Sequence, residues 1–251
     1  MISIMLKMKK NWGRWGKSDE LGTINFITKD KIKRAMLLAR DGTTVSCART
    51  IKTSTRPDMK SEAMRYTVDS NEIRSMEFIG MVFHGRSITH LDSPAHFFRK
   101  GKIYNNLPAK GAEFRDAEVL KKGILTRRVL LDLTGKAGSI SDLEAAEKKN
   151  GLKAGSGDVL LVKTGRPLRA GAASWFGKRE IAVIGSDTPN DAPFFHTACL
   201  TDLGLWILDN CDLEELAKIC KEKKRWEFLI FIAPLRLQNV TGSPVNPIAI
   251  F

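Results

Sequence analysis

Apolar residues along the chain follow two patterns, which predict a protein of alternating strands and helices. Almost continuous apolar runs are typical of strands covered on both faces, and they occur at 123–133, 158–163, 181–187 and 227–232. Apolar residues at helical spacing predict helices at 28–40, 141–150, 198–204 and 214–225. Further strands are expected at 43–49, 77–84 and 205–208. The alternation favours a single α/β domain over residues 1–251.

Polar residues indicate where several helices begin. Thr28 and Asp212 stand directly before helical patterns, as N-cap residues do. Residues 141–144, Ser-Asp-Leu-Glu, resemble a capping box, and Gly151 is suited to end the helix that follows.

Four segments lack a regular pattern. Residues 11–25 combine glycines with tryptophans and predict an ordered N-terminal aromatic loop. The polar stretch 50–74 fits either a loop beside a site or a poorly patterned strand pair. Two apolar pieces around an Arg-Lys-Gly turn predict a hairpin at 97–105. The apolar end of the chain, 248–251, is expected to be docked on the core.

Composition and charge restrict the class of protein. A chain of 251 residues with 43% hydrophobic residues is long enough to bury a core. Its formal net charge is +13. Lysines and arginines are interleaved with acids along the whole length, and no aromatic-basic stripe accompanies them, which favours a solvated basic surface. A nucleic-acid-binding protein is the alternative that the net charge leaves open.

The cysteines and the N-terminus indicate the compartment. Cys47, Cys199, Cys211 and Cys220 form no CxxC pair, so we interpret them as packing residues in a reducing environment. The N-terminus does not have the pattern of a signal peptide, and no run of about 18 apolar residues occurs. We therefore expect a cytoplasmic protein without a membrane partner.

Histidines are concentrated in one segment. Three of the four histidines, His84, His90 and His96, fall within thirteen positions around Asp92. On an extended backbone the side chains of His90 and Asp92 point the same way, so they can hold one ion together. Pro94 ends strand pairing and can carry His96 back over that ion. A lone histidine is more often a surface or hydrogen-bonded residue, but this cluster predicts a metal site.

More distant residues can complete the site, because a catalytic metal has at least three protein ligands. His196 and Asp209 follow after a helix and a strand that can return them to the cluster. With His90 and Asp92 they form a mixed imidazole and carboxylate set that suits Zn²⁺ or Mn²⁺. Asp187 ends a predicted strand, where α/β proteins place site residues, and is either a substrate contact or a turn residue that caps the strand end.

A longer motif surrounds the histidine cluster. Residues 89–96, Thr-His-Leu-Asp-Ser-Pro-Ala-His, match position by position the second half of the signature H-x-G-T-H-x-D-x-P-x-H. The sequence thereby resembles the cyclase-like metal-dependent hydrolases, which include bacterial kynurenine formamidase, isatin hydrolase and a trans-dienelactone hydrolase. Further segments carry the resemblance along the chain, at 12–16, 19–25, 157–165, 208–210, 225–228 and 241–247. The resemblance implies a swivelling β/β/α-type fold with a mixed central sheet and a divalent metal.

The resemblance also implies roles for the clustered residues. His90 and Asp92 fall on ligand positions of the signature, and His96 falls on the position of the catalytic histidine. His196 corresponds to the distal histidine ligand, and Asp209 stands where many relatives carry a glutamate. We therefore expect one metal, held by His90, Asp92 and His196.

The first half of the signature is altered. Arg86 takes the place of the first histidine, and Ile88 takes the place of the glycine. A guanidinium stays cationic and cannot ligate a metal, but its fork geometry suits a substrate carboxylate. His84, two residues earlier, is either a substitute ligand or a packing residue behind the ligands.

The implied activity is hydrolysis of a small amide, cyclic imide or lactone. The metal would activate a water, and His96 would move the proton as general acid and base. A small molecule is the expected substrate, and the resemblance implies a homodimer or homotetramer, with 11–25 as a candidate interface. The alternative is a degenerate relative that binds a small molecule without turning it over, because Arg86 stands at a ligand position.

Overall fold

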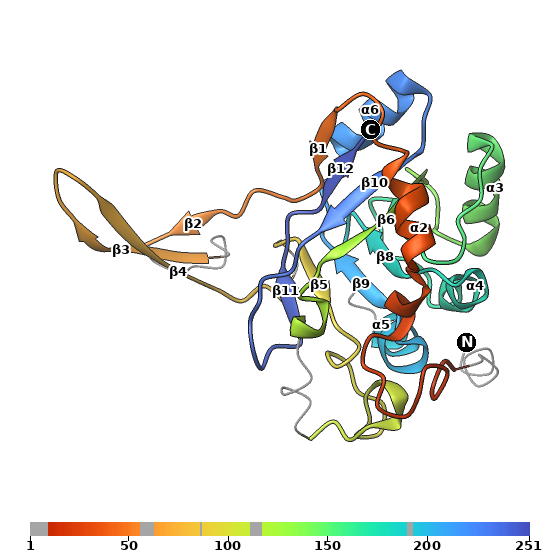
Figure 1. Ribbon diagram of the computed structural model, residues 1–251, viewed down its shortest axis with the longest axis horizontal. Helices are drawn as coiled ribbons and strands as arrows, with labels where there is room; N and C mark the ends of the chain where they lie inside the picture. The colour runs from red at the N-terminus through yellow and green to blue at the C-terminus, as the bar shows by residue number, and fades with distance from the viewer. Residues whose placement is uncertain (1–9, 56–62, 86, 111–116, 190–192) are drawn as a thin grey trace.

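The computed structural model describes residues 10–55, 63–85, 87–110, 117–189 and 193–251 (Figure 1). One large mixed sheet has the order β1-β12-β10-β6-β7-β8-β9-β5-β11. Its strands are β1 (Thr44–Ser46), β5 (His90–Asp92), β6 (Ile124–Asp132), β7 (Val159–Lys163), β8 (Val183–Ser186), β9 (Trp206–Asp209), β10 (Glu227–Ile232), β11 (Gly242–Pro244) and β12 (Ile248–Ile250). Strands β6 to β9 are parallel, and the other pairs are antiparallel. The predicted α/β architecture with a mixed central sheet is confirmed.

The apolar runs of the sequence become the central strands because both faces of the sheet are covered. Along β6, Leu130 enters one buried cluster, whereas Val129 and Leu131 enter the other. The first cluster packs against α6 (Glu214–Lys223), and the second packs against α3 (Ile140–Asn150) and α4 (Ala172–Arg179). In the described ranges, no helix has the length and apolar character needed to cross a membrane.

The helix starts agree with the sequence more closely than the helix ends. Thr28 caps α2 (Lys29–Met36) by accepting a hydrogen bond from the Lys31 amide. The helix ends at Met36, short of the predicted position 40, because the following turn carries Asp41 and Gly42 to the carbonyl of Phe251.

The capping box of α3 lies upstream of the predicted one. Ser139 and Asp142 form it reciprocally, so the predicted box at 141–144 is wrong by two positions. Gly151 ends the helix in the left-handed conformation, as expected. The N-cap of α6 is Leu213, without a side-chain cap hydrogen bond, so the prediction of Asp212 as the cap is wrong by one position. Asp212 Oδ1 nevertheless accepts a hydrogen bond from the Glu214 amide at 3.2 Å.

The predicted helix at 198–204 is present but is wound differently. A short helix, α5 (Pro193–His196), leads into the π-helix η5 (Thr197–Leu203), which ends at Gly204. The aromatic loop packs on this π-helix, because the indole of Trp12 donates to the Thr201 carbonyl at 2.7 Å. Trp12 thereby holds this segment against η5.

Strands from the C-terminal end of the chain complete the sheet. β12 inserts between β1 and β10, which confirms that the apolar C-terminal end is docked. The hairpin predicted at 97–105 is also present, with Arg99 and Lys102 exchanging backbone hydrogen bonds of 2.7 and 3.0 Å.

A second, smaller sheet comprises β2 (Thr53–Ser54), β3 (Ala63–Ser70) and β4 (Ser75–Met81). It projects from the main body on the side away from α3 and α4 (Figure 1). The described part of 50–74 is therefore a strand pair, which was one of the two expected arrangements. The chain leaving β4 runs directly to His84 and the histidine cluster.

Candidate metal centre

Neighbouring strands β5 and β9 place three predicted ligands on one face of the sheet. In their antiparallel register, His90 lies opposite Asp209, and Asp92 lies opposite Ile207. Side chains alternate along a strand, so His90, Asp92 and Asp209 share a face while Leu91 enters the core on the other. All three ligand candidates are buried.

His196 reaches the same place from the end of α5. Its Nε2 atom lies 3.4 Å from Asp92 Oδ2 and 3.5 Å from Asp209 Oδ2. The ring of Phe97 packs on the imidazole with 4.6 Å between centroids. The π-helix begins directly after His196, and π-helical turns are frequent at functional sites.

His84 and His96 form the other side of the centre. Their rings stack with 3.9 Å between centroids and 18° between planes. His84 Nε2 lies 3.3 Å from Asp92 Oδ1, and His90 Nε2 lies 3.4 Å from the same oxygen. His96 Nδ1 lies 3.4 Å from Thr241 Oγ1. All four histidines of the chain therefore gather around one buried carboxylate.

Hydrogen bonds with backbone carbonyls orient His90 and the loop that precedes it. His90 Nδ1 lies 2.8 Å from the Ile88 carbonyl, which can only accept, so neutral His90 turns an unprotonated Nε2 toward Asp92. Asn210 donates to the carbonyls of Gly85 and Ile88 at 2.6 and 3.1 Å. The loop before β5 is thereby tied to the end of β9.

The pKa values of the titratable groups in the centre are shifted in different directions. Burial acts to raise the pKa of Asp92, but its close contacts with the imidazoles of His196 and His84 outweigh burial and hold that pKa well below its usual range. Burial also acts to lower the pKa of His196, yet hydrogen bonds with Asp209 and Asp92 raise it to about 10. For His96, burial is the largest effect and lowers the pKa to about 4, against the attraction of Asp92. Without a metal, His196 carries a proton at neutral pH and His96 does not.

The donor atoms fit a divalent cation. Two overlapping groups, His90 with Asp92 and Asp209, and His84 with Asp92 and His96, each have donor atoms within 4.8 Å of one another. Buried Asp92 Oδ1 has no hydrogen-bond partner among the described residues. Buried lone pairs of this kind are costly unless a ligand satisfies them, and the mixed nitrogen and oxygen set suits Zn²⁺ or Mn²⁺.

The sequence predicted Arg86 and Asp187 as substrate contacts. Arg86 falls outside the described residues. The carboxylate of Asp187 accepts hydrogen bonds from the amides of Thr164 and Gly165, at 2.9 Å and 3.0 Å for the shorter contacts. These bonds tie the ends of β7 and β8 together, which is the strand-end role that the sequence also allowed.

Three residues beside the centre were not singled out from the sequence. Asn210 ties the loop before β5, Thr241 contacts His96, and Gly242 lies opposite Asp92 in the pairing of β11 with β5. The segment 241–247 carried part of the family resemblance, but only the strand register shows that it borders the centre.

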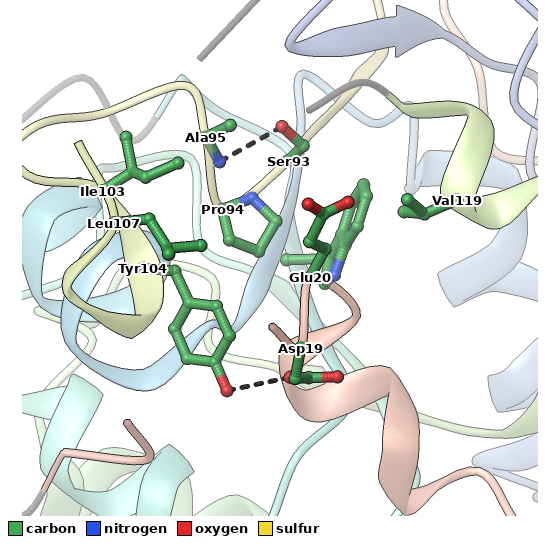
Figure 2. A pocket seen from close by; sticks show the side chains of 10 residues that line it. Asp19, Glu20, Ser93, Pro94, Ala95, Ile103, Tyr104, Leu107 and Val119 are labelled. Atoms are coloured by element: carbon green, nitrogen blue, oxygen red, sulfur yellow. Dashed lines mark hydrogen bonds between the residues drawn. The ribbon is translucent and has the colours of Figure 1, made fainter. Parts of the chain in front are cut away.

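Ser93, Pro94 and Ala95 help to line a small cavity (Figure 2). Trp206 lines it, and Trp206 alternates along β9 with the face that carries Asp209. Tyr104 donates to Asp19 Oδ2 there at 3.1 Å, and burial together with Asp19 raises the pKa of its phenol. The cavity is therefore separate from the histidine cluster.

The fold and the donor set define a class: an α/β protein with a buried histidine and carboxylate centre that fits a divalent cation. The family model named Cyclase matches residues 67–191. A crystal structure described as a novel cyclase is 26% identical, has a TM-score of 0.87, and covers 98% of this chain and 99% of its own. The chain belongs to the Cyclase family.

More distant solved structures share the fold. Isatin hydrolase A from Ralstonia solanacearum is 16% identical with a TM-score of 0.60, covering 88% of this chain and 97% of its own. A predicted metal-dependent hydrolase from Bacillus stearothermophilus is 17% identical with a TM-score of 0.53, covering 84% and 98%. No curated protein matched the sequence.

Proposed function

We propose that the protein is a metal-dependent hydrolase of a small amide, cyclic imide or lactone. One observation carries this proposal: buried Asp92 lies within 3.3–3.4 Å of the Nε2 atoms of His84, His90 and His196. Such a concentration of imidazoles on one carboxylate is typical of metal ligation and has no evident packing purpose. The family match and the names of the solved relatives support hydrolysis as the reaction class.

A divalent cation would be held by His90, Asp92 and His196, with Asp209 as a further oxygen ligand. A divalent ion held there, Zn²⁺ or Mn²⁺, would supply Lewis-acid chemistry by lowering the pKa of water and polarising the substrate carbonyl. The chain supplies the orientation, because Ile88 fixes the tautomer of His90.

His96 is proposed to move the proton. Its pKa of about 4 keeps the imidazole neutral at pH 7, so it can accept a proton from the attacking water. With Nδ1–H donating to Thr241 Oγ1, Nε2 carries the lone pair that accepts this proton, which then passes to the leaving nitrogen or oxygen. The low pKa makes His96 a weaker base than an unperturbed histidine, so much of the activation must come from the cation.

Two residues are candidates for substrate recognition. Arg86 supplies a cationic fork next in sequence to this centre, and we propose that it binds a substrate carboxylate. Asp187 is the lesser candidate, because backbone amides already occupy its carboxylate.

The proposal is tested with metal-stripped protein that is reloaded with Mn²⁺ or Zn²⁺ and offered an aryl amide, a cyclic imide and a lactone. We expect hydrolysis of one of these classes, restored by metal and abolished by a chelator. Metal-loaded protein that binds members of the panel but hydrolyses none would instead support the alternative, a degenerate relative that binds a small molecule without turning it over.

A further inference from the structure

His84 is placed in the centre although the family signature assigns no ligand to its position. Its Nε2 atom lies 3.3 Å from Asp92 Oδ1, and neither atom has a hydrogen-bond partner among the described residues. Asp92 itself is 1% exposed, so this oxygen is a buried acceptor aimed at an imidazole nitrogen that could ligate the same ion. The pair resembles two ligands that lack their cation more than it resembles a finished hydrogen bond.

Gly242 makes the space in which His84 lies. A Cβ atom at this position would come within 2.5 Å of His84 Nε2 and 2.6 Å of the Leu91 carbonyl. The φ angle of Gly242 is not in the left-handed region, so the backbone conformation does not require glycine here. Glycine is required by two close approaches, that of the Leu91 carbonyl on the paired strand β5 and that of the imidazole, so β11 as it is paired with β5 leaves room for His84.

His84 and His96 offer a separate set of ligands with Asp92. The three donor atoms lie within 4.8 Å of one another, and the two rings are stacked. Asp92 Oδ2 faces His196 on the other side of the carboxylate, at 3.4 Å. A bridging carboxylate can hold two ions about 3.5–4 Å apart, so the second set does not exclude an ion in the first.

The second set competes with proton transfer. Thr241 lies against His96 Nδ1, so Nε2 is the ring nitrogen left for other partners. A single lone pair cannot bind a cation and accept a proton at the same time. An ion held by His84, Asp92 and His96 would therefore remove His96 from the reaction.

We propose that His84, Asp92 and His96 form a second, inhibitory cation position, which Gly242 makes possible by admitting His84. This inference rests on the proposed function, because it assigns a regulation to the same centre. The first ion supports hydrolysis, and a second divalent ion switches it off by occupying His96. Loss of the ion from the second position returns His96 to proton transfer.

The test uses full-length protein stripped of metal and titrated with Mn²⁺. Free Mn²⁺ is counted by electron paramagnetic resonance, and hydrolysis is measured on the same samples. For the wild type we expect two bound ions, an exchange-coupled signal from the pair, and a rate that rises with the first equivalent and then falls by about tenfold or more as the second binds.

Two variants remove the second position in different ways. His84→Asn deletes the ligand, and Gly242→Ala displaces the ring. Each should bind one Mn²⁺ without the coupled signal, and its rate should no longer fall as Mn²⁺ is added. Val82→Ala, at an exposed position on the same segment, is the matched control and should still bind two ions and show the fall.

The outcomes separate this inference from the proposed function. One bound ion in the wild type, with a rate that rises and stays level, overturns the inhibitory position and leaves the hydrolase proposal standing. A fall in rate that persists in His84→Asn also overturns it. Wild-type protein that binds no Mn²⁺ and hydrolyses nothing at any metal concentration overturns both. If Gly242→Ala does not fold, His84→Asn decides alone.

Discussion

At the scale of single residues, the centre is organised by Asp92. Four imidazoles lie around this carboxylate, and it comes from a three-residue strand whose alternate side chains face the site. The sequence could predict His90, Asp92 and His96, because they stand within one motif. It left His84 open as a substitute ligand or a packing residue, because its placement depends on Gly242, which is far away in the chain and borders the centre only through the register of β11 with β5.

Replacing His96 should separate catalysis from metal binding. We predict that His96→Ala lowers kcat by about 10²–10⁴-fold, because general acid–base catalysis contributes on that order, while the first cation stays bound. Steady-state kinetics and metal analysis of the same preparation measure the two effects. A variant that keeps the full rate contradicts the assignment of proton transfer to His96.

Metal binding should release a proton. His196 has a pKa of about 10 in the metal-free protein, so below that pH its imidazole is protonated and must lose the proton before it can ligate. We therefore predict that affinity for Mn²⁺ increases from pH 7 to pH 9, and that about one proton is released per ion at pH 7. Calorimetry in two buffers with different ionisation enthalpies measures the release. Binding without proton release would show that His196 is not a ligand.

At the scale of secondary-structure elements, the apolar runs located the central strands because their residues are buried on both faces. Some element ends were less predictable, because they are decided by contacts that are distant in sequence. Helix α2 stops at Met36 because Asp41 and Gly42 bind the carbonyl of Phe251. The π-helix after His196 is likewise invisible in the apolar spacing, which predicts a helix but not its winding.

Strand β6 carries two adjacent arginines in opposite situations, which gives a matched pair of variants. Arg127 binds buried Asp158 through two nitrogens and also binds Glu227. Arg128 is fully buried and contacts Cys47 Sγ at 3.1 Å, while its Nε and Nη2 atoms have no hydrogen-bond partner within the described ranges.

We predict that Arg127→Met lowers the free energy of unfolding by about 3 kcal/mol, because Asp158 stays buried with fewer partners. Arg128→Met should leave the stability unchanged or raise it, since a buried guanidinium without a full set of partners is costly. Denaturant unfolding of both variants measures the difference. A loss at Arg128 as large as that at Arg127 would contradict this account and indicate a compensating partner.

At the scale of the whole molecule, the sequence predicted the α/β class and the strand content, and the resemblance predicted the mixed sheet. The order of the strands was not predictable, because β12 and β11 come last in the chain and yet lie next to β1 and β5. The projecting β3–β4 hairpin was also not resolved from its sequence. Its apolar residues stay on the surface, so they follow no burial pattern that a sequence would reveal.

We expect the chain to self-associate through this hairpin instead of through segment 11–25, which packs on η5 of its own chain. Tyr66 and Phe78 stack on it with 4.8 Å between ring centroids, and they are 46% and 40% exposed. Ile79 is 52% exposed, so the apolar surface extends over both faces. Contiguous exposed apolar surface of this kind marks contact sites.

We predict that the wild type is a dimer or tetramer and that the double variant Phe78→Ser, Ile79→Ser has a smaller mass in light scattering. Leu37→Ser is the control, because Leu37 is 74% exposed but follows α2 on the main body. A monomeric wild type, or an equal effect of the control, would contradict the role of the hairpin.

The central claim is that Asp92 is a ligand of a metal centre, and metal analysis tests it most directly. Wild-type protein and the nearly isosteric Asp92→Asn variant are purified without chelators, checked for folding by circular dichroism, and measured by inductively coupled plasma mass spectrometry. The account predicts at least one tightly bound Zn²⁺ or Mn²⁺ per wild-type chain and none in the folded variant. Equal metal content in the two proteins, or none in either, would contradict it.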